Sequence, residues 1–359
     1  EVLVAAGAKV DACNKQGDTA LLLASAAGLV DVVRVLVAAR ADAFVSNATG
    51  QTALTCALAE AHADVLRVLA QVRDTHGNTA LMLAAKTGDL NTVKQLLAVD
   101  AAVDATNDQG KTALQLAADE DHKAVVQLLG NITDTDDNSA VMTAAHNGDM
   151  ALLNKLIASK AALDEHNVLG QTPLMLASRN GHTDAVQALV AARANVRARD
   201  DQGSSAIAEA AFNGHVDVLR VLAKAKAPIH VENKQCQTPL MLAVAAGHVD
   251  VVQFLVDVGA DLDACESDGF TALTIAASEG LVDIVRILAD ANASLDIRNR
   301  SGETALIAAA ASGHADAVRV LLDAGADTEI ASKTGATALN VAEAGNYAEV
   351  VEILKSHKQ

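Results

Sequence analysis

The heptapeptide QTPLMLA at 171–177 recurs letter for letter at 237–243, 66 residues later. Half of that interval, 33 residues, is a period that most of the chain follows. Thr or Ser, then Ala or Pro, then an aliphatic residue recurs with its first residue at Thr19, Thr52, Thr79, Thr112, Ser139, Thr172, Ser205, Thr238, Thr271, Thr304 and Thr337. A repeat of this length predicts identical small units that stack in a row, instead of one spherical core.

The unit at 234–266 can be interpreted residue by residue. Thr238 is a good N-cap, and Pro239 suits the first helical position, where a missing N–H costs nothing. A helix is predicted over 240–246, and Gly247 permits the left-handed turn after it. Asp250 then favours the start of a second helix, which Gly259 ends. One face of this helix is apolar and predicted to be buried: Val251, Val252, Leu255 and Val258.

The order Gly-x-Thr-Pro-Leu, helix, Gly-His, second helix and Gly-Ala-Asp resembles the ankyrin repeat. The resemblance implies an all-α solenoid of helix-turn-helix units with hairpin loops, in a curved, elongated stack. It implies one domain over 1–359, with a partial repeat at 1–14 and eleven anchored repeats. These start near 15, 48, 75, 108, 135, 168, 201, 234, 267, 300 and 333, and the repeats at 48–74 and 108–134 are only 27 residues long.

Several residues depart from the family pattern. The fourth position of the family motif is usually His, but here it is Leu22, Thr55, Met82, Gln115, Met142, Met175, Ala208, Met241, Thr274, Ile307 or Asn340. Apolar packing is expected to replace the family's histidine bond in most repeats.

Gly after the second helix occurs only at Gly7, Gly259 and Gly325. If the non-glycine residues at that position are left-handed, each strains the chain by up to about 1–2 kcal/mol: Arg40, Lys160, Arg193, Lys226 and Asn292. Such choices indicate a natural sequence and not a consensus design.

The two short repeats each lose six residues after the second helix and replace the mid-repeat Gly with Ala61 or Asp121. We expect the deletion to remove the projecting hairpin while both helices remain and adjacent layers still stack. Residues 1–14 match the second half of a repeat. This predicts that more protein precedes Glu1 or that a partner covers this end.

Composition excludes several classes of function. The net charge of −18 disfavours nucleic acid and anionic membrane surfaces as partners. Much of this charge stands at helix starts, as at Asp31, Asp217 and Asp283. The sequence contains no apolar run of transmembrane length, and its four cysteines form no disulfide or zinc pattern. We therefore expect an intracellular protein of the cytoplasm or nucleus, without membrane insertion.

The histidines favour a structural role over catalysis. Six of eleven occupy one slot in the repeat, directly after the mid-repeat Gly or its replacement: His62, His122, His182, His215, His248 and His314. A catalytic group is normally single, and no nucleophile–base pair, phosphate-binding loop or metal motif accompanies them. We expect no catalytic, cofactor-binding or metal-binding residue, and no cofactor.

Binding sites follow from the resemblance, which implies contacts beside the first Gly and at the end of the first helix. The candidates are Phe212, Phe270, Asn213, Asp268, Gln237, Arg179, Asn180, Leu169, His146 and Lys86. Phe212 and Phe270 stand out because most equivalent positions are polar or small, although each could instead pack on a neighbouring hairpin. Phe254 lies on the core face of a second helix.

The preferred hypothesis is a non-enzymatic scaffold that binds a protein partner on its concave face, as a monomer or as part of a longer chain. Two alternatives stay open. The chain could be the ankyrin region of a larger enzyme or channel, or an elastic spacer between two attachment points.

Overall fold

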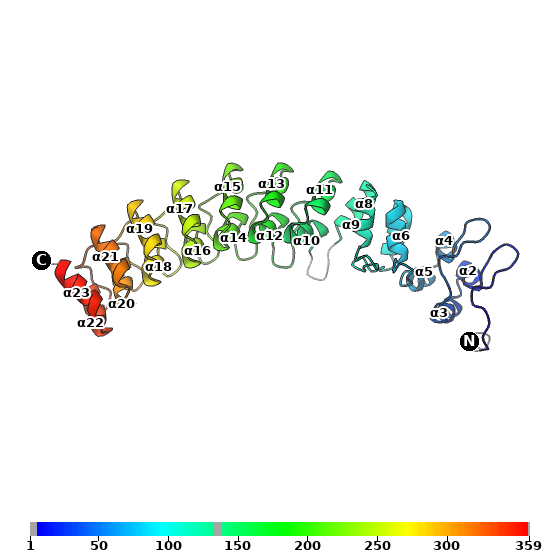
Figure 1. The fold of residues 1–359 in the computed structure, drawn as a ribbon, viewed down its shortest axis with the longest axis horizontal. Helices are drawn as coiled ribbons and strands as arrows, with labels where there is room; N and C mark the ends of the chain where they lie inside the picture. Colours follow the sequence, from blue (N-terminus) through cyan, green and yellow to red (C-terminus); the bar gives the residue numbers. More distant parts are fainter. Residues whose placement is uncertain (1–5, 133–137, 358–359) are drawn as a thin grey trace. The chain divides into compact units, whose positions relative to one another are not determined.

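The computed structural model describes residues 6–132 and 138–357 and is all-α, which confirms the predicted fold class. Isolated bridges pair Cys13 with Thr19 and Arg73 with Thr79. Helices alternate along the chain as a first and a second helix of each repeat (Figure 1). The expected repeat start near 135 and most of the partial repeat's helix lie outside the described residues.

The first helices are mostly two turns long. They are α2 (Ala20–Ala26), α4 (Ala53–Ala59), α6 (Ala80–Thr87), α8 (Ala113–Asp119), α10 (Ala140–Asn147), α12 (Pro173–Arg179), α14 (Ala206–Phe212), α16 (Pro239–Ala245), α18 (Ala272–Ser278), α20 (Ala305–Ala311) and α22 (Ala338–Ala344). The second helices are α3 (Val30–Ala38), α5 (Ala63–Leu69), α7 (Leu90–Leu97), α9 (Lys123–Gly130), α11 (Met150–Ala158), α13 (Thr183–Ala191), α15 (Val216–Lys224), α17 (Val249–Asp257), α19 (Val282–Asp290), α21 (Ala315–Asp323) and α23 (Ala348–His357).

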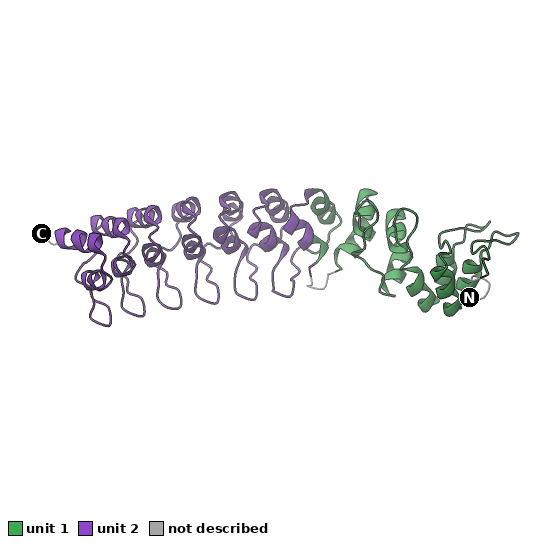
Figure 2. Cartoon of the chain, turned by 60° about the horizontal axis from the view of Figure 1, so that its bottom comes forward, with its two compact units in different colours: residues 1–135, 139–141, 151–162 green, residues 136–138, 142–150, 163–359 purple. Residues whose placement is uncertain are grey.

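The chain divides into two compact units (Figure 2). The first comprises 1–135, 139–141 and 151–162, and the second comprises 136–138, 142–150 and 163–359. In the second unit the first helices from α12 to α22 pack side by side, as do the second helices from α13 to α23. Hairpins between repeats project along one side of this unit. In the first unit α2 packs against α4, and α6 packs against α8.

Threonine and serine begin the first helices, as the motif predicts. The Thr238 hydroxyl accepts a hydrogen bond from the backbone N–H of Met241 at 3.3 Å, with Pro239 in the first turn. The same cap recurs in the other fully described first helices, from Thr19 to Thr337. Each cap satisfies an amide that has no partner inside the helix, which contributes about 1 kcal/mol per repeat.

At the position where the family carries His, seven repeats have a buried apolar side chain, as expected. These are Leu22, Met82, Met142, Met175, Ala208, Met241 and Ile307. In three others a polar side chain accepts from the N-cap amide instead. Thr55, Gln115 and Asn340 form these capping boxes, with bonds of 2.8, 3.0 and 3.1 Å. The helix start therefore closes without histidine in these repeats.

The core between repeats is a ladder of aliphatic side chains one repeat apart. In the second unit Leu189, Leu222, Leu255, Leu288 and Leu321 are all fully buried. Removing each Leu from water stabilises the stack by about 1.5–3 kcal/mol, and each needs a neighbouring repeat to cover it. Val258 was predicted to join this face, but it is 38% exposed. The helix ends at Asp257, and Val258 is its C-cap, beyond the helical face.

The six periodic histidines tie successive repeats together, which confirms their structural role. Each Nε2 donates to a main-chain carbonyl of the preceding repeat, 36 residues earlier, at 2.9–3.1 Å. Each ring also lies over the mid-repeat glycine of that preceding repeat. For His248 the glycine is Gly214, where an added Cβ would stand 2.9 Å from the ring. We call this arrangement the His–Gly contact.

The non-glycine residues that occupy the glycine position after the second helices are left-handed. Arg40, Lys160, Arg193, Lys226 and Asn292 have φ between 60° and 69°. Ala61, Asp121 and Cys236, which replace glycines of the repeat, are left-handed too, at 56°, 58° and 59°. The backbone turn is therefore kept even where the residue makes it unfavourable, because the flanking helices fix it.

The prediction that shortening removes the hairpin is wrong for the first short repeat. After α5 the chain still forms a hairpin tip, where the Asp74 N–H donates to Asn78 O at 2.9 Å and the Gly77 N–H to Asp74 O at 3.1 Å. Asp74 Oδ1 also accepts from the His76 amide at 2.8 Å. The six lost residues come from the helix end and the stem that leads to the tip. The corresponding tip after the second short repeat includes 133–137, outside the described residues.

Candidate functional site

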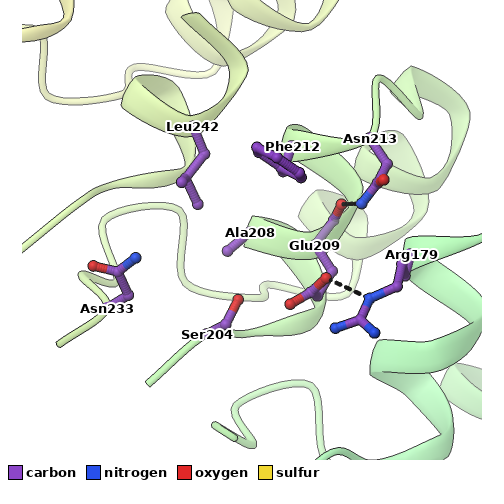
Figure 3. A pocket seen from close by; sticks show the side chains of 8 residues that line it. All are labelled: Arg179, Ser204, Ala208, Glu209, Phe212, Asn213, Asn233 and Leu242. Atoms are coloured by element: carbon purple, nitrogen blue, oxygen red, sulfur yellow. Dashed lines mark hydrogen bonds and ion pairs between the residues drawn. The ribbon is translucent and has the colours of Figure 1, made fainter. Parts of the chain in front are cut away.

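A pocket of about 400 Å³ opens on the second unit, between three first helices (Figure 3). Its lining comes from α12, α14 and α16 and from the stems of two hairpins. The residues are Arg179, Ser204, Ala208, Glu209, Phe212, Asn213, Asn233 and Leu242. The repeat produces this site because it places the ends of successive first helices side by side, one repeat apart.

Phe212 is the largest apolar group in the pocket and the last residue of α14. Phe212 is 51% exposed, so its ring does not pack fully on a neighbouring hairpin. The backbone beneath it is fixed, because the Phe212 carbonyl accepts from His248 Nε2 at 3.0 Å. The site therefore exposes an aromatic ring on a preformed backbone, an arrangement that reduces the ordering cost of binding.

Arg179 and Glu209 make an ion pair across two repeats, with Nε and Oε2 2.9 Å apart. The Glu209 side chain is 12% exposed and that of Arg179 is 37% exposed, so the pair is partly shielded from water. The two charges cancel inside the pocket. A ligand group that enters beside Phe212 consequently meets a nearly neutral environment, which favours an uncharged side chain.

The remaining polar groups are held by helix-end and hairpin bonds. Asn213 Nδ2 donates to the Glu209 carbonyl at 2.8 Å and so closes the end of α14. Asn233 Nδ2 donates to Gln237 Oε1 at 2.9 Å, within the next hairpin. Figure 3 shows Phe212, Ala208 and Leu242 toward one side of the pocket, and Ser204 and Asn233 toward the other. The pocket thus combines an apolar side with a rim of hydrogen-bonding groups.

Three predicted site residues, Phe212, Asn213 and Arg179, meet in this pocket. Asn180 and His146 form an adjoining pair, with Asn180 Nδ2 2.9 Å from His146 Nδ1. These residues come from three successive repeats of the second unit. The prediction that they contact a partner remains a prediction.

The other candidates lie outside the pocket. Phe270 is half-buried, with its amide 3.3 Å from Glu266 Oε1, and Asp268 faces Arg300 at 3.6 Å. Gln237 accepts from Asn233, and Leu169 is 56% exposed at a hairpin tip. Lys86 belongs to the first unit, and its carbonyl accepts from His122 at 2.9 Å.

Glu209 and Leu242 were missed by the sequence reasoning. Glu209 stands 30 residues after Arg179, one turn before Phe212, so the pair does not share a slot of the repeat. A search for opposite charges 30 residues apart, which is one repeat minus about one helical turn, could have found this pair. Leu242 resembles a core residue in sequence, and only its partial exposure reveals a contact surface.

Within the residues that the structure describes, no group of three His, Cys, Asp or Glu side chains could hold a metal ion. Burial raises the pKa of the Cys56 thiol, and partial desolvation together with nearby carboxylates raises the pKa of the exposed Cys265 thiol, so both are weak nucleophiles. No helix in these residues is long and apolar enough to cross a membrane.

A family model described as ankyrin repeats matches residues 1–74, 70–139, 141–233, 225–299 and 291–359. These matches span nearly the whole chain and agree with the helix pairs and hairpins described above. The comparison with curated proteins found no match.

Proposed function

Because this chain belongs to the ankyrin-repeat family, whose repeats are generally modules of protein–protein interaction, we propose that it is a non-enzymatic scaffold. We propose the pocket around Phe212 as its principal contact site, on the face built by first helices and hairpins. The single observation that carries this proposal is the exposed Phe212 ring on a backbone fixed by His248.

The chemistry of the pocket suggests what it receives. Phe212 and Leu242 offer apolar contact, and the Arg179–Glu209 pair leaves little net charge. The Asn213 and Asn233 amides at the rim can bond to a peptide backbone. The proposed partner therefore presents an extended segment with one bulky, uncharged apolar side chain, which takes the place of water against Phe212.

The test is affinity capture with the full chain, followed by mass spectrometry. The bait is compared with Phe212→Ala and with the double variant Phe212→Ala/Phe270→Ala. The matched control is Val258→Ala, which also removes an exposed apolar side chain but lies at the end of a second helix. Circular dichroism confirms that every variant folds.

We expect a partner that the wild type and Val258→Ala retain and that Phe212→Ala binds about tenfold more weakly or loses, as for a central aromatic contact. Retention of the same partner by all variants would contradict the role of Phe212. A wild-type bait that captures no specific protein would contradict the scaffold itself.

A further inference from the structure

Ordinary neighbouring repeats in the first unit are joined by three kinds of hydrogen bond. One links the backbones of adjacent hairpin tips, one links side chains of adjacent hairpin stems, and one is the histidine-to-carbonyl bond. Between the repeats starting near 15 and 48 these are Ala48 N–Gln16 O (3.0 Å), Asn47 Nδ2–Asp18 Oδ1 (2.8 Å) and His62 Nε2–Ala26 O (3.1 Å). Between those near 75 and 108 they are Asp108 N–His76 O (3.1 Å), Asn107 Nδ2–Asn78 Oδ1 (2.8 Å) and His122 Nε2–Lys86 O (2.9 Å).

The step between these two pairs, after the first short repeat, has none of the three. Among the described residues, no hydrogen bond or ion pair joins 6–72 to 75–132. Helix packing is interrupted at the same place. First helices pack side by side from α2 to α4 and from α6 to α8, whereas α4 and α6 make no contact of comparable extent. The expectation that adjacent layers stay stacked here is therefore wrong.

The sequence explains the missing histidine bond. The mid-repeat position of the short repeat is Ala61. At the equivalent glycines of the His–Gly contacts a Cβ would stand only 2.5–2.9 Å from the histidine ring, so the Ala61 methyl leaves no room for one. The histidine slot of the next repeat is Asp89, which turns back to cap its own helix by accepting from the Thr92 amide at 3.1 Å. Glycine and histidine are thus both absent from this one contact.

Chain length explains the missing hairpin bonds. In the repeat starting near 15, the second helix ends at Ala38 and the next hairpin tip begins at Asn47. In the short repeat α5 ends at Leu69 and the tip begins at Asp74. The linking stem is four residues shorter, which reduces its reach by about 13 Å. The second tip consequently cannot lie along the first.

Apolar contact across this step is narrow. One buried cluster includes Leu21, Leu36, Leu66 and Leu69 from the first two repeats. Its one member beyond residue 72 is Val99, from the segment after α7. A repeat array is held together by the sum of its neighbour contacts, so a step without hydrogen bonds and with little helix packing couples its two sides weakly.

We propose that residues 70–75 form a flexible joint, across which α2–α5 reorient and open independently of α6–α9. The joint lets the hairpin at 47–51 and the first helices beside it adjust to a partner surface while each side keeps its own core. It does not depend on binding at Phe212.

Spin-label distances in the full chain test the joint directly. The pair Arg67→Cys/Lys94→Cys spans it, and Arg34→Cys/Arg67→Cys spans the ordinary step before it. All three positions are exposed and equivalent in their second helices. The native cysteines at 13, 56, 236 and 265 are first replaced by Ser or Ala. We expect a distance distribution at least twofold wider for the first pair, and equal widths would overturn the joint.

Hydrogen exchange of the unlabelled chain gives a second measurement that needs no substitution. We expect the amides of α2–α5 to exchange as one group, at least tenfold faster than those of α6–α9. The control is α20–α23 at the other end of the chain. These helices are joined to the repeat before them by the His–Gly contact of His314 with Gly280 and by the packing of α18 on α20. If α2–α5 and α6–α9 exchange with the same protection, the two sides open together and the proposal fails.

Discussion

His248 Nε2 lies 3.0 Å from the carbonyl oxygen of Phe212, so a side chain of one repeat fixes the exposed aromatic residue of the repeat before it. Because a carbonyl only accepts, the ring donates through Nε2. The ring itself rests on Gly214, which has φ +80°. The aromatic side chain that lines the pocket thus depends on the contact that also holds the stack together.

Gly214→Ala should destabilise the chain more than Gly247→Ala. Both glycines are left-handed, at φ 80° and 73°, so both variants bear a strain of about 1–2 kcal/mol. Only at Gly214 would the new Cβ meet a ring, 2.9 Å away, because nothing lies within 4 Å at Gly247. We expect an additional loss of about 1–3 kcal/mol for Gly214→Ala, measured by urea unfolding. Equal losses would show that the His–Gly contact tolerates a methyl group.

Lys226→Gly should stabilise the chain by about 0.5–1 kcal/mol. Lys226 is left-handed at φ 60°, which glycine adopts without strain, although the greater freedom of the unfolded glycine offsets part of the gain. Lys224→Gly is the control, since it changes the same residue type at the last residue of α15, where the backbone is helical and glycine costs up to about 1 kcal/mol. A rise in urea midpoint for the first variant and a fall for the second are expected. A fall for both would argue that Lys226 makes a contact worth more than its strain.

Asp89→Ala should cost about 1 kcal/mol at neutral pH, because Asp89 caps α7. Hydrogen bonds from the Thr92 side chain and amide lower the pKa of the Asp89 carboxyl below its ordinary 3.8. The charged form is therefore stabilised by folding. This contribution is fully present above pH 3.8 and is lost as the pH falls through the lowered folded value.

The difference between wild type and Asp89→Ala should accordingly shrink in acid, measured by unfolding between pH 7 and pH 2. Asp89→Asn keeps an uncharged cap and is expected to show no such change at this site. A wild-type advantage that is constant down to pH 2 would contradict a charged cap.

Phe254→Leu should lower the free energy of unfolding by about 0.5–1 kcal/mol more than the loss of buried apolar area alone accounts for. The Arg220 guanidinium lies 5.3 Å from the centre of the Phe254 ring, across the α15–α17 contact. A double-mutant cycle with Arg220→Met isolates the interaction, since each single variant removes the same contact. A coupling energy near zero would show that Phe254 acts only through packing.

Much of each repeat could be predicted from the sequence because its chemistry is local. A threonine hydroxyl reaches an amide three residues on, and a left-handed turn is required wherever two short helices meet within a few residues. These rules placed Thr238 and Gly247 correctly. They failed at Val258, where helical periodicity extended past the end of the helix.

The sequence by itself determined the period, the helix pairs, their caps and the structural role of the six histidines. Only the tertiary structure decided that Arg179 meets Glu209, that Phe212 remains exposed, and that the first short repeat keeps its hairpin but loses its contacts with the next repeat. The physical reason is range. A cap or a turn is settled within about four residues, whereas these contacts depend on how side chains about one repeat apart meet across a stacking step.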